Sequence, residues 1–223
     1  MLSAAACLDW AARLTGAPDV ATLLARAEAL GAAQRDAAPI FLPYLSGERT
    51  PHNDPDAQGV LFGLTSQHDA AALAWAVLEG VGFGLRDGLR SLALPPGPTV
   101  LTLVGGGARS TLWARMLASI LGVTLERRHG AEAGGALGAA RLGWLADGGS
   151  VEQVCREPAG RVERFESDAA EAARYAARYR RFRALYPAVE LSVTNAATST
   201  VLDSLRRHEL DRILTGQPAA VMT

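Results

Sequence analysis

Three consecutive glycines separate an apolar run from a run with helical periodicity in the segment TVLTLVGGGARSTLW, residues 99–113. Residues 99–104 are rich in β-branched and apolar side chains, as in a buried strand, and the apolar residues after Ser110 recur at helical spacing. Glycine lacks a Cβ atom and adopts positive φ, so such a turn lets another group approach the backbone. The N–H groups at the start of the next helix can bind an anion. The segment predicts a strand, a glycine turn and a helix, with a nucleotide or no ligand at the turn.

The same order of elements recurs directly downstream. Residues 123–128 (VTLERR) are typical of a strand, and a second glycine-bearing turn precedes an expected helix at residues 135–146. Two successive units of strand, turn and helix indicate a parallel sheet and α/β architecture.

Further elements are expected from apolar periodicity and from Gly and Pro stops. The first is a strand end at residues 1–6 that enters a helix stopped by Gly16, and the next is a short helix from Asp19 to about Leu30 that Gly31 ends. An extended run at 39–45 and a strand buried on both faces at 59–65 follow. The remaining two are a long helix at 69–92 and a last helix at 167–186. The glycines at 80, 82, 84 and 88 of the long helix predict a closely packed second backbone.

Composition excludes several classes of function. The chain has 223 residues, 49% of them hydrophobic, which suffices for a core, and its net charge of −1 gives no basic face for nucleic acid. All 22 basic residues are arginine. Without lysine, the chain has neither a P-loop nor a Schiff-base amine.

The cysteines and the first residues indicate the compartment. Cys7 and Cys155 are far apart and outside any CxxC motif, which argues against a structural zinc site and suits a reducing environment. The apolar start carries Asp9 and Arg13 and has no basic leader. We expect a cytoplasmic protein with no membrane span and no nucleic-acid partner.

Several polar residues are weighed as sites. His52, Asp54 and Asp56 lie in the loop at 46–59, where they could hold a cation, but we favour a polar surface loop. Glu48 and Arg49 either order this loop or reach toward a cleft. His68 and His129 are expected at the surface, without partners nearby in the sequence.

The last predicted helix carries two patterned faces. Its aromatic stripe, Tyr175, Tyr179, Phe182 and Tyr186, predicts a packing face. Its arginines are expected on a solvated face; they are Arg174, Arg178, Arg180, Arg181 and Arg183.

Four blocks of the sequence resemble, in order and spacing, the C-terminal half of the FGGY carbohydrate kinases, most closely the D-xylulose kinase branch. The blocks are YLSGERTPHNDPDAQGVLFGLT, AVLEGVGFGLRDG, LVGGGARSTLWARMLASILG and GGALGAARLG. The resemblance runs from Met1 to about Tyr186, and Ala72 departs from the polar residue usual in the family. It implies an actin-like, ribonuclease-H-like ATPase lobe at residues 1–190, incomplete at its N-terminal end, and a tail of unknown role at 191–223.

The resemblance also implies which residues face ATP. In the first turn they are Gly105, Gly106, Gly107, Ala108, Arg109, Ser110 and Thr111, and in the second turn Gly134 and Gly135. Near the start of the chain, Asp9 and Ala5 match the family more weakly. A Cβ atom at Gly106 or Gly107 would then occupy the volume of the nucleotide. No catalytic and no metal-binding residue is assigned.

Phosphoryl transfer to a sugar needs a base near the hydroxyl and a clamp for the phosphates with Mg²⁺. In the family that the chain resembles, the base and the phosphate clamp lie in parts that precede Met1. We therefore expect this chain to bind ATP with Mg²⁺ and to be inactive alone. D-xylulose would be bound only through the missing N-terminal lobe. The incomplete sheet leaves an open strand edge that invites pairing with another chain, as in a homodimer.

Two other hypotheses stay open. The chain could be a degenerate module that binds no nucleotide and serves interaction or dimerisation. It could also be the lobe of a kinase for another sugar or polyol, such as glycerol, ribulose or gluconate.

Overall fold

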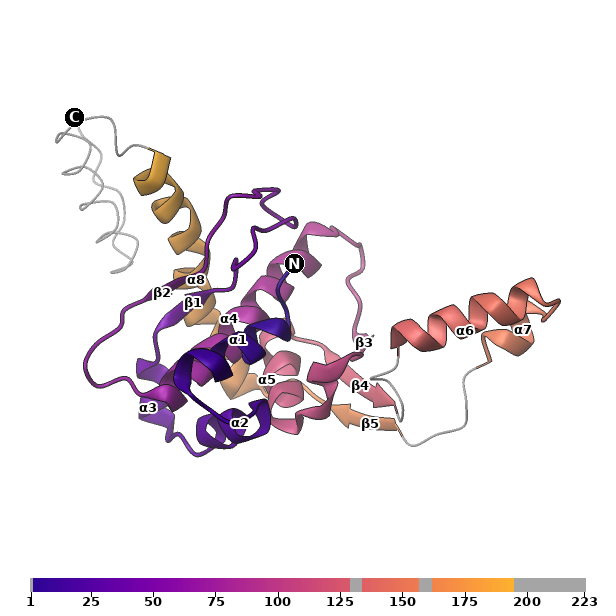
Figure 1. Cartoon of the computed structure of the whole chain (residues 1–223), viewed down its shortest axis with the longest axis horizontal. Coiled ribbons are helices and arrows are strands. Elements are labelled where there is room, and N and C mark those ends of the chain that lie inside the picture. The colour runs from indigo at the N-terminus through magenta and orange to yellow at the C-terminus, as the bar shows by residue number, and fades with distance from the viewer. Residues whose placement is uncertain (1, 129–133, 157–161, 195–223) are drawn as a thin grey trace. The chain divides into compact units, whose positions relative to one another are not determined.

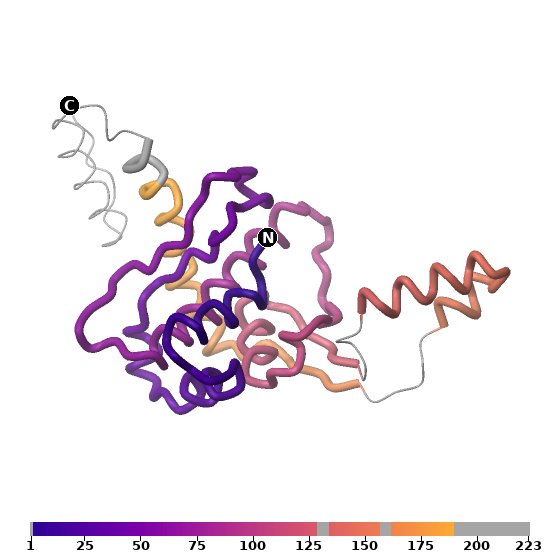
Figure 2. Tube along the Cα trace, viewed as in Figure 1, coloured from indigo at the N-terminus to yellow at the C-terminus, as the bar shows by residue number. Residues whose placement is uncertain are grey.

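The computed structural model describes residues 2–128, 134–156 and 162–194 (Figures 1 and 2). The chain divides into two compact units, one comprising the residues up to Ser91 and those from Ala173 onward, the other Leu92–Ala172. The predictions for His129 and for most of the tail at 191–223 lie outside the described residues.

The first unit is built around the long helix α4 (Ala70–Ser91). Its apolar residues recur every three or four positions, and the face that they form is buried, with Trp75 only 2% exposed. The helix confirms the prediction at 69–92. The other elements of this unit are α1 (Ala6–Thr15), α2 (Val20–Glu28), α3 (Ala32–Ala37), β1 (Ile40–Leu42), β2 (Val60–Phe62) and the part of α8 (Ala169–Thr194) that starts at Ala173.

Local signals set the ends of the first helices. Gly16 follows α1 with a φ of +64°, in the left-handed region, which is the stop predicted from the sequence. The Asp19 carboxylate caps α2 by accepting a hydrogen bond from the N–H of Thr22 at 2.7 Å. Gly31 precedes α3 rather than ending α2, because the Gln34 side chain accepts a hydrogen bond from its N–H.

A glycine of α4 allows the close helix packing that the sequence predicts. A Cβ atom added at Gly80 would lie 2.3 Å from the carbonyl oxygen of Phe41 in β1, so only glycine lets α4 and β1 approach this closely. At Gly88, on the same helix, an added Cβ atom would meet no other atom within 4 Å. The prediction is therefore confirmed at Gly80 and wrong at Gly88.

Helix α8 packs with its aromatic stripe, but Arg174, which pairs with Asp36 at 3.2 Å and is 22% exposed, and Arg178 do not lie on a solvated face. Tyr175, Tyr179 and Phe182 are buried, which confirms the packing face. Arg178 is also buried, contrary to the expected solvated face, and donates hydrogen bonds to the Glu79 carboxylate at 2.6–2.8 Å. The same guanidinium donates to the carbonyl oxygens of residues 36, 38 and 39 at 2.7, 2.9 and 3.4 Å. Arg178 thus ties α8 to α4 and to the chain before β1.

The second unit contains the predicted parallel pair of strands. Strand β3 (Val100–Thr102) pairs parallel with β4 (Thr124–Arg128), and α5 (Thr111–Leu121) connects them. The short strand β5 (Val162–Phe165), which the sequence did not reveal, adds antiparallel to β4, so the order is β3-β4-β5. The unit also holds α6 (Gly134–Ala146) and α7 (Val151–Val154).

Three further sequence predictions are wrong. Residues 2–5 contain no strand, because α1 already starts at Ala6. Strand β2 is half-buried rather than buried on both faces, since it pairs with β1 alone in a two-stranded sheet. His68 has partners: its Nδ1 accepts a hydrogen bond from the N–H of Thr65 at 2.9 Å, and its Nε2 lies 2.9 Å from the carbonyl oxygen of Ala37.

The structure also bears on the cysteines and on membrane-spanning helices. Cys7 and Cys155 are both free thiols. No described helix combines the length and the apolar character needed to cross a bilayer.

Candidate functional site

The glycine turn of the second unit follows β3 directly. Gly105 has a φ of +86°, a conformation that side chains other than glycine rarely adopt. The turn continues as the 3-10 helix η1 (Gly106–Arg109). The Ser110 hydroxyl then caps α5 by accepting a hydrogen bond from the N–H of Trp113 at 3.1 Å. The order of strand, glycine turn and helix is as predicted, but the strand, which was predicted to be buried, is exposed at Val100 and Thr102 because it lies at an edge of the sheet.

The three glycines of this turn have different surroundings. A Cβ atom added at Gly105 or Gly106 would meet no other atom within 4 Å, and Gly106 is exposed. At Gly107 an added Cβ atom would lie 2.5 Å from the Trp113 ring. Gly107 is therefore required by the packing of the protein itself. The prediction that a ligand fills the space at Gly107 is wrong, because the Trp113 ring fills it. The open backbone is limited to Gly105 and Gly106.

Arg127 of β4 holds the second half of the turn. Its Nη1 donates to the carbonyl oxygen of Ala108 at 2.7 Å and to that of Arg109 at 3.1 Å, and its Nη2 lies 3.3 Å from the Thr111 hydroxyl. Glu163 of β5 pairs with the same guanidinium. Sequence reasoning did not find Arg127, because its partners lie 16 to 36 positions away along the chain. This arginine fixes the conformation of the turn from the side of the sheet.

The predicted residues Ala108, Ser110 and Thr111 use their polar groups within the turn. The Ala108 side chain is 2% exposed, its N–H donates to the carbonyl of Gly105 and its own carbonyl accepts from Arg127. Arg109 is exposed. Any ligand at this turn would thus meet the backbone of Gly105 and Gly106 and the side chain of Arg109.

Gly134 and Gly135, predicted in the second turn, are the first two residues of α6, and the rest of that turn lies outside the described residues. A Cβ atom added at Gly134, the first residue of α6, would lie 3.5 Å from the Val104 side chain, whereas Gly135 is open. The first turn lies at the carboxyl end of β3, which pairs parallel with β4, and open α/β sheets usually bind ligands at this edge. Asp9 and Ala5 belong to the first unit, Asp9 as an exposed residue of α1 and Ala5 as the residue before it.

The loop at 46–59 is held in place by contacts within its own unit. Glu48 is 2% exposed and accepts a hydrogen bond from the N–H of Thr50 at 3.1 Å, so it orders the loop from inside. The Tyr186 hydroxyl donates to Asp54 at 2.7 Å, and this hydrogen bond is the main cause that lowers the pKa of Asp54. Among the described residues, no group of three or more His, Cys, Asp or Glu side chains is arranged to hold a metal ion.

Comparison with known proteins gives a consistent result. Residues 3–146 match the model of the FGGY family of carbohydrate kinases, C-terminal domain. The chain is 51% identical over 191 residues to the xylulose kinase of Escherichia coli K12, and the aligned region covers 83% of this chain and 38% of that protein. It is 56% identical over 148 residues to the xylulose kinase of Klebsiella pneumoniae, covering 66% of this chain and 30% of that protein.

A solved structure supports the same assignment of the fold. The crystal structure of a xyloylose kinase from Brucella ovis superposes with a TM-score of 0.72 at 41% identity, over 86% of this chain and 39% of that chain. The chain spans less than half the length of each of these relatives.

Proposed function

The chain belongs to the FGGY family of carbohydrate kinases, and on this premise we propose that it is the ATP-binding lobe of a xylulose kinase. The whole enzyme would transfer the γ-phosphoryl group of MgATP to the 5-hydroxyl of D-xylulose. Residues 1–190 would form the lobe, residues 191–223 a tail of unknown role, and the enzyme would work in the cytoplasm. The fold is that of a partial C-terminal lobe of the actin-like ATPases.

The open backbone at the carboxyl edge of the β3–β4 pair is the observation that carries this proposal. Gly105 and Gly106 present main chain that no side chain covers, and Arg127 holds the turn in place. A planar base or a ribose can rest on such a surface, because no Cβ atom keeps it at a distance. Arg109 and the start of α5 add positive charge and helix N–H groups on the same turn. Gly134 and Gly135 would border the nucleotide from the second turn.

The open glycine turn supports ATP as the ligand, but we assign no resident Mg²⁺ site to the described residues. No cluster of three potential ligands occurs among them, and the glycine turn has no carboxylate. Magnesium usually reaches such enzymes on the phosphates of the nucleotide, held by few protein ligands. We assign no general base to these residues, so the sugar and the base that accepts its proton would come from the rest of the enzyme, and we expect no turnover by this chain alone.

We expect millimolar ATP with Mg²⁺ to raise the melting temperature of the purified chain, because a ligand that binds only the folded state stabilises it. Gly106→Val should abolish most of this rise, since its side chain would stand in the open space above the turn. Differential scanning calorimetry over a series of ATP concentrations measures both effects.

Gly143→Val is the matched control for this experiment. Gly143 lies on α6 in the same unit, and an added Cβ atom meets nothing within 4 Å there either. This variant should keep the full response to ATP. An unchanged melting temperature of the parent chain at millimolar ATP, or an equal response of Gly106→Val, would exclude the turn as a nucleotide site.

A second candidate function, an interaction module that binds no nucleotide, is favoured by two observations. Strand β3 lies at an edge of the described sheet, and its Val100 is 47% exposed. On α6, Leu142 and Trp144 are 68% and 52% exposed. Open strand edges and exposed apolar side chains promote association between chains. Light scattering with an ATP titration separates the two functions, because a pure interaction module forms dimers without any response to ATP.

We further propose that the sugar substrate of the whole enzyme is D-xylulose. Only the resemblance to xylulose kinases points to D-xylulose, whereas glycerol, ribulose and gluconate are the competing substrates. Combining this chain with the rest of the enzyme and comparing ATP consumption on these compounds would identify the sugar.

A further inference from the structure

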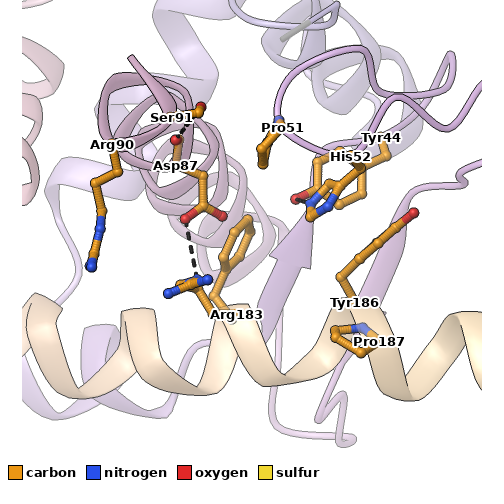
Figure 3. A pocket seen from close by; sticks show the side chains of 10 residues that line it. Tyr44, Pro51, His52, Asp87, Arg90, Ser91, Arg183, Tyr186 and Pro187 are labelled. Atoms are coloured by element: carbon orange, nitrogen blue, oxygen red, sulfur yellow. Dashed lines mark hydrogen bonds and ion pairs between the residues drawn. The ribbon is translucent and has the colours of Figure 1, made fainter. Parts of the chain in front are cut away.

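The first unit contains a cavity that the proposed function does not use. It has a volume of about 440 Å³ and opens between the C-terminal part of α4, the loop at 46–59 and α8 (Figure 3). Pockets of this size hold a single small molecule. Its lining residues are Tyr44, Pro51, His52, Asp87, Arg90, Ser91, Phe182, Arg183, Tyr186 and Pro187.

A buried carboxylate faces this cavity with one oxygen unused. Asp87 is 7% exposed, and its Oδ1 accepts the hydrogen bond of the Tyr179 hydroxyl and pairs with Arg183 at 3.5 Å. Burial raises the pKa of Tyr179 to about 12, so its hydroxyl stays protonated and donates. The other oxygen, Oδ2, accepts no hydrogen bond from any described residue. Oδ2 is accessible, so it can accept a hydrogen bond from a ligand hydroxyl or from water.

Two arginines give the cavity a net positive charge. Arg90 extends from α4 on the side of Asp87 away from His52, and Arg183 reaches Asp87 from α8 (Figure 3). Arg183 is neutralised by Asp87, whereas Arg90 makes no hydrogen bond or ion pair with any described residue. One carboxylate and two guanidinium groups carry a net charge of about +1, which one anionic group of a ligand would balance. Guanidinium groups bind carboxylates and phosphates well.

The opposite wall is apolar and held rigidly. The His52 ring stacks on the Tyr186 ring with centroids 3.7 Å apart, and its Nε2 lies 3.0 Å from the Tyr44 hydroxyl. Tyr186 in turn donates to Asp54 at 2.7 Å, so the loop is fastened to α8. Pro51 continues this wall. A carbon skeleton can pack against these rings without any rearrangement of the protein.

We propose that this cavity binds a molecule of monosaccharide size that carries several hydroxyl groups and one anionic group, a phosphate or a carboxylate. A hydroxyl donates to Oδ2 of Asp87, the anionic group accepts from Arg90, and the carbon skeleton lies against Pro51 and His52. The cavity belongs to the first unit and the glycine turn to the second, so each site can be tested without the other.

Calorimetric titration of the full chain tests this site. Ribose 5-phosphate and gluconate serve as probes for the two anionic groups. Ribose and inorganic phosphate are the two halves of the first probe, and sorbitol and acetate are those of the second. The sugar phosphate or the sugar acid should bind more tightly than its own two halves, and the tighter of the two probes identifies the anionic group. Arg90→Gln should weaken this binding about tenfold, as expected for the loss of a charge-assisted hydrogen bond.

Arg86→Gln is the matched control, because Arg86 lies one turn away on α4 and stands over the Tyr179 ring at 4.4 Å, outside the cavity. It should leave the affinity unchanged. Asp87→Asn is a second variant, which can keep an acceptor for Tyr179 and replaces the free oxygen by a donor, so it should also weaken binding. The proposal is overturned when neither probe binds more tightly than its halves, or when Arg90→Gln and Arg86→Gln lower the affinity equally.

Discussion

Replacing Arg178 with methionine is expected to lower the free energy of unfolding of the first unit by about 3–5 kcal/mol, as for other buried ion pairs that lose one partner. The side chains of Arg178 and Glu79 are 7% and 1% exposed. Without the guanidinium, the Glu79 carboxylate stays buried without its counter-ion, and three carbonyl oxygens of residues 36–39 lose a donor. Urea denaturation followed by circular dichroism measures the loss.

The same variant should acquire a characteristic dependence on pH. Burial raises the pKa of Glu79 even with Arg178 in contact, and without the arginine this pKa is expected to rise further. A group with a raised pKa in the folded state stabilises the fold below its unfolded pKa and loses this contribution as the pH rises through the folded value. Arg178→Met should therefore be more stable at pH 5 than at pH 8.

Two controls belong to this experiment. Arg181→Met, at an exposed position of the same helix, should change the free energy by no more than about 0.5 kcal/mol. The double variant Glu79→Leu with Arg178→Met should recover part of the stability, because no buried charge remains. A loss below about 1 kcal/mol for Arg178→Met alone would contradict a dominant role of this pair.

Gly80→Ala is the second change with a large expected effect. The new methyl group would lie 2.3 Å from the carbonyl oxygen of Phe41, so α4 and β1 must move apart within a packed core. Overpacking of this kind costs about 1–3 kcal/mol and sometimes more. Denaturation midpoints in urea should fall accordingly.

Gly88→Ala provides the opposite expectation on the same helix. Nothing lies within 4 Å of the added methyl group, so the gain in helix propensity should raise the stability by about 0.5–1 kcal/mol. Equal effects of the two substitutions would show that the contact with Phe41 does not limit the packing of α4.

Local sequence signals predict the elements whose causes are local. The periodicity of residues 69–92, the stop at Gly16 and the cap at Asp19 each depend on neighbours within a few positions, and all are found in the structure. Helices α3 and α7, with six and four residues, are too short to display a period. Strand β5 depends on its pairing with β4, which is distant in the sequence.

The candidate site shows the same division. The glycine turn itself follows from composition, whereas the reason for Gly107 is the Trp113 ring and the support of the turn is Arg127. Arg178 illustrates the limit most clearly. Within a run of arginines on α8 nothing distinguishes it, and only the carboxylate of Glu79, 99 positions earlier, explains its burial.

Mapping of amide chemical shifts by nuclear magnetic resonance during addition of MgATP tests the central claim most directly. We predict that the amide signals of Gly105, Gly106 and Arg109 shift progressively and saturate, while those around Asp87 in the first unit do not. Saturating shifts confined to other residues, or no shift at Gly105 and Gly106 at millimolar MgATP, would contradict the assignment of this turn as the surface that holds the nucleotide.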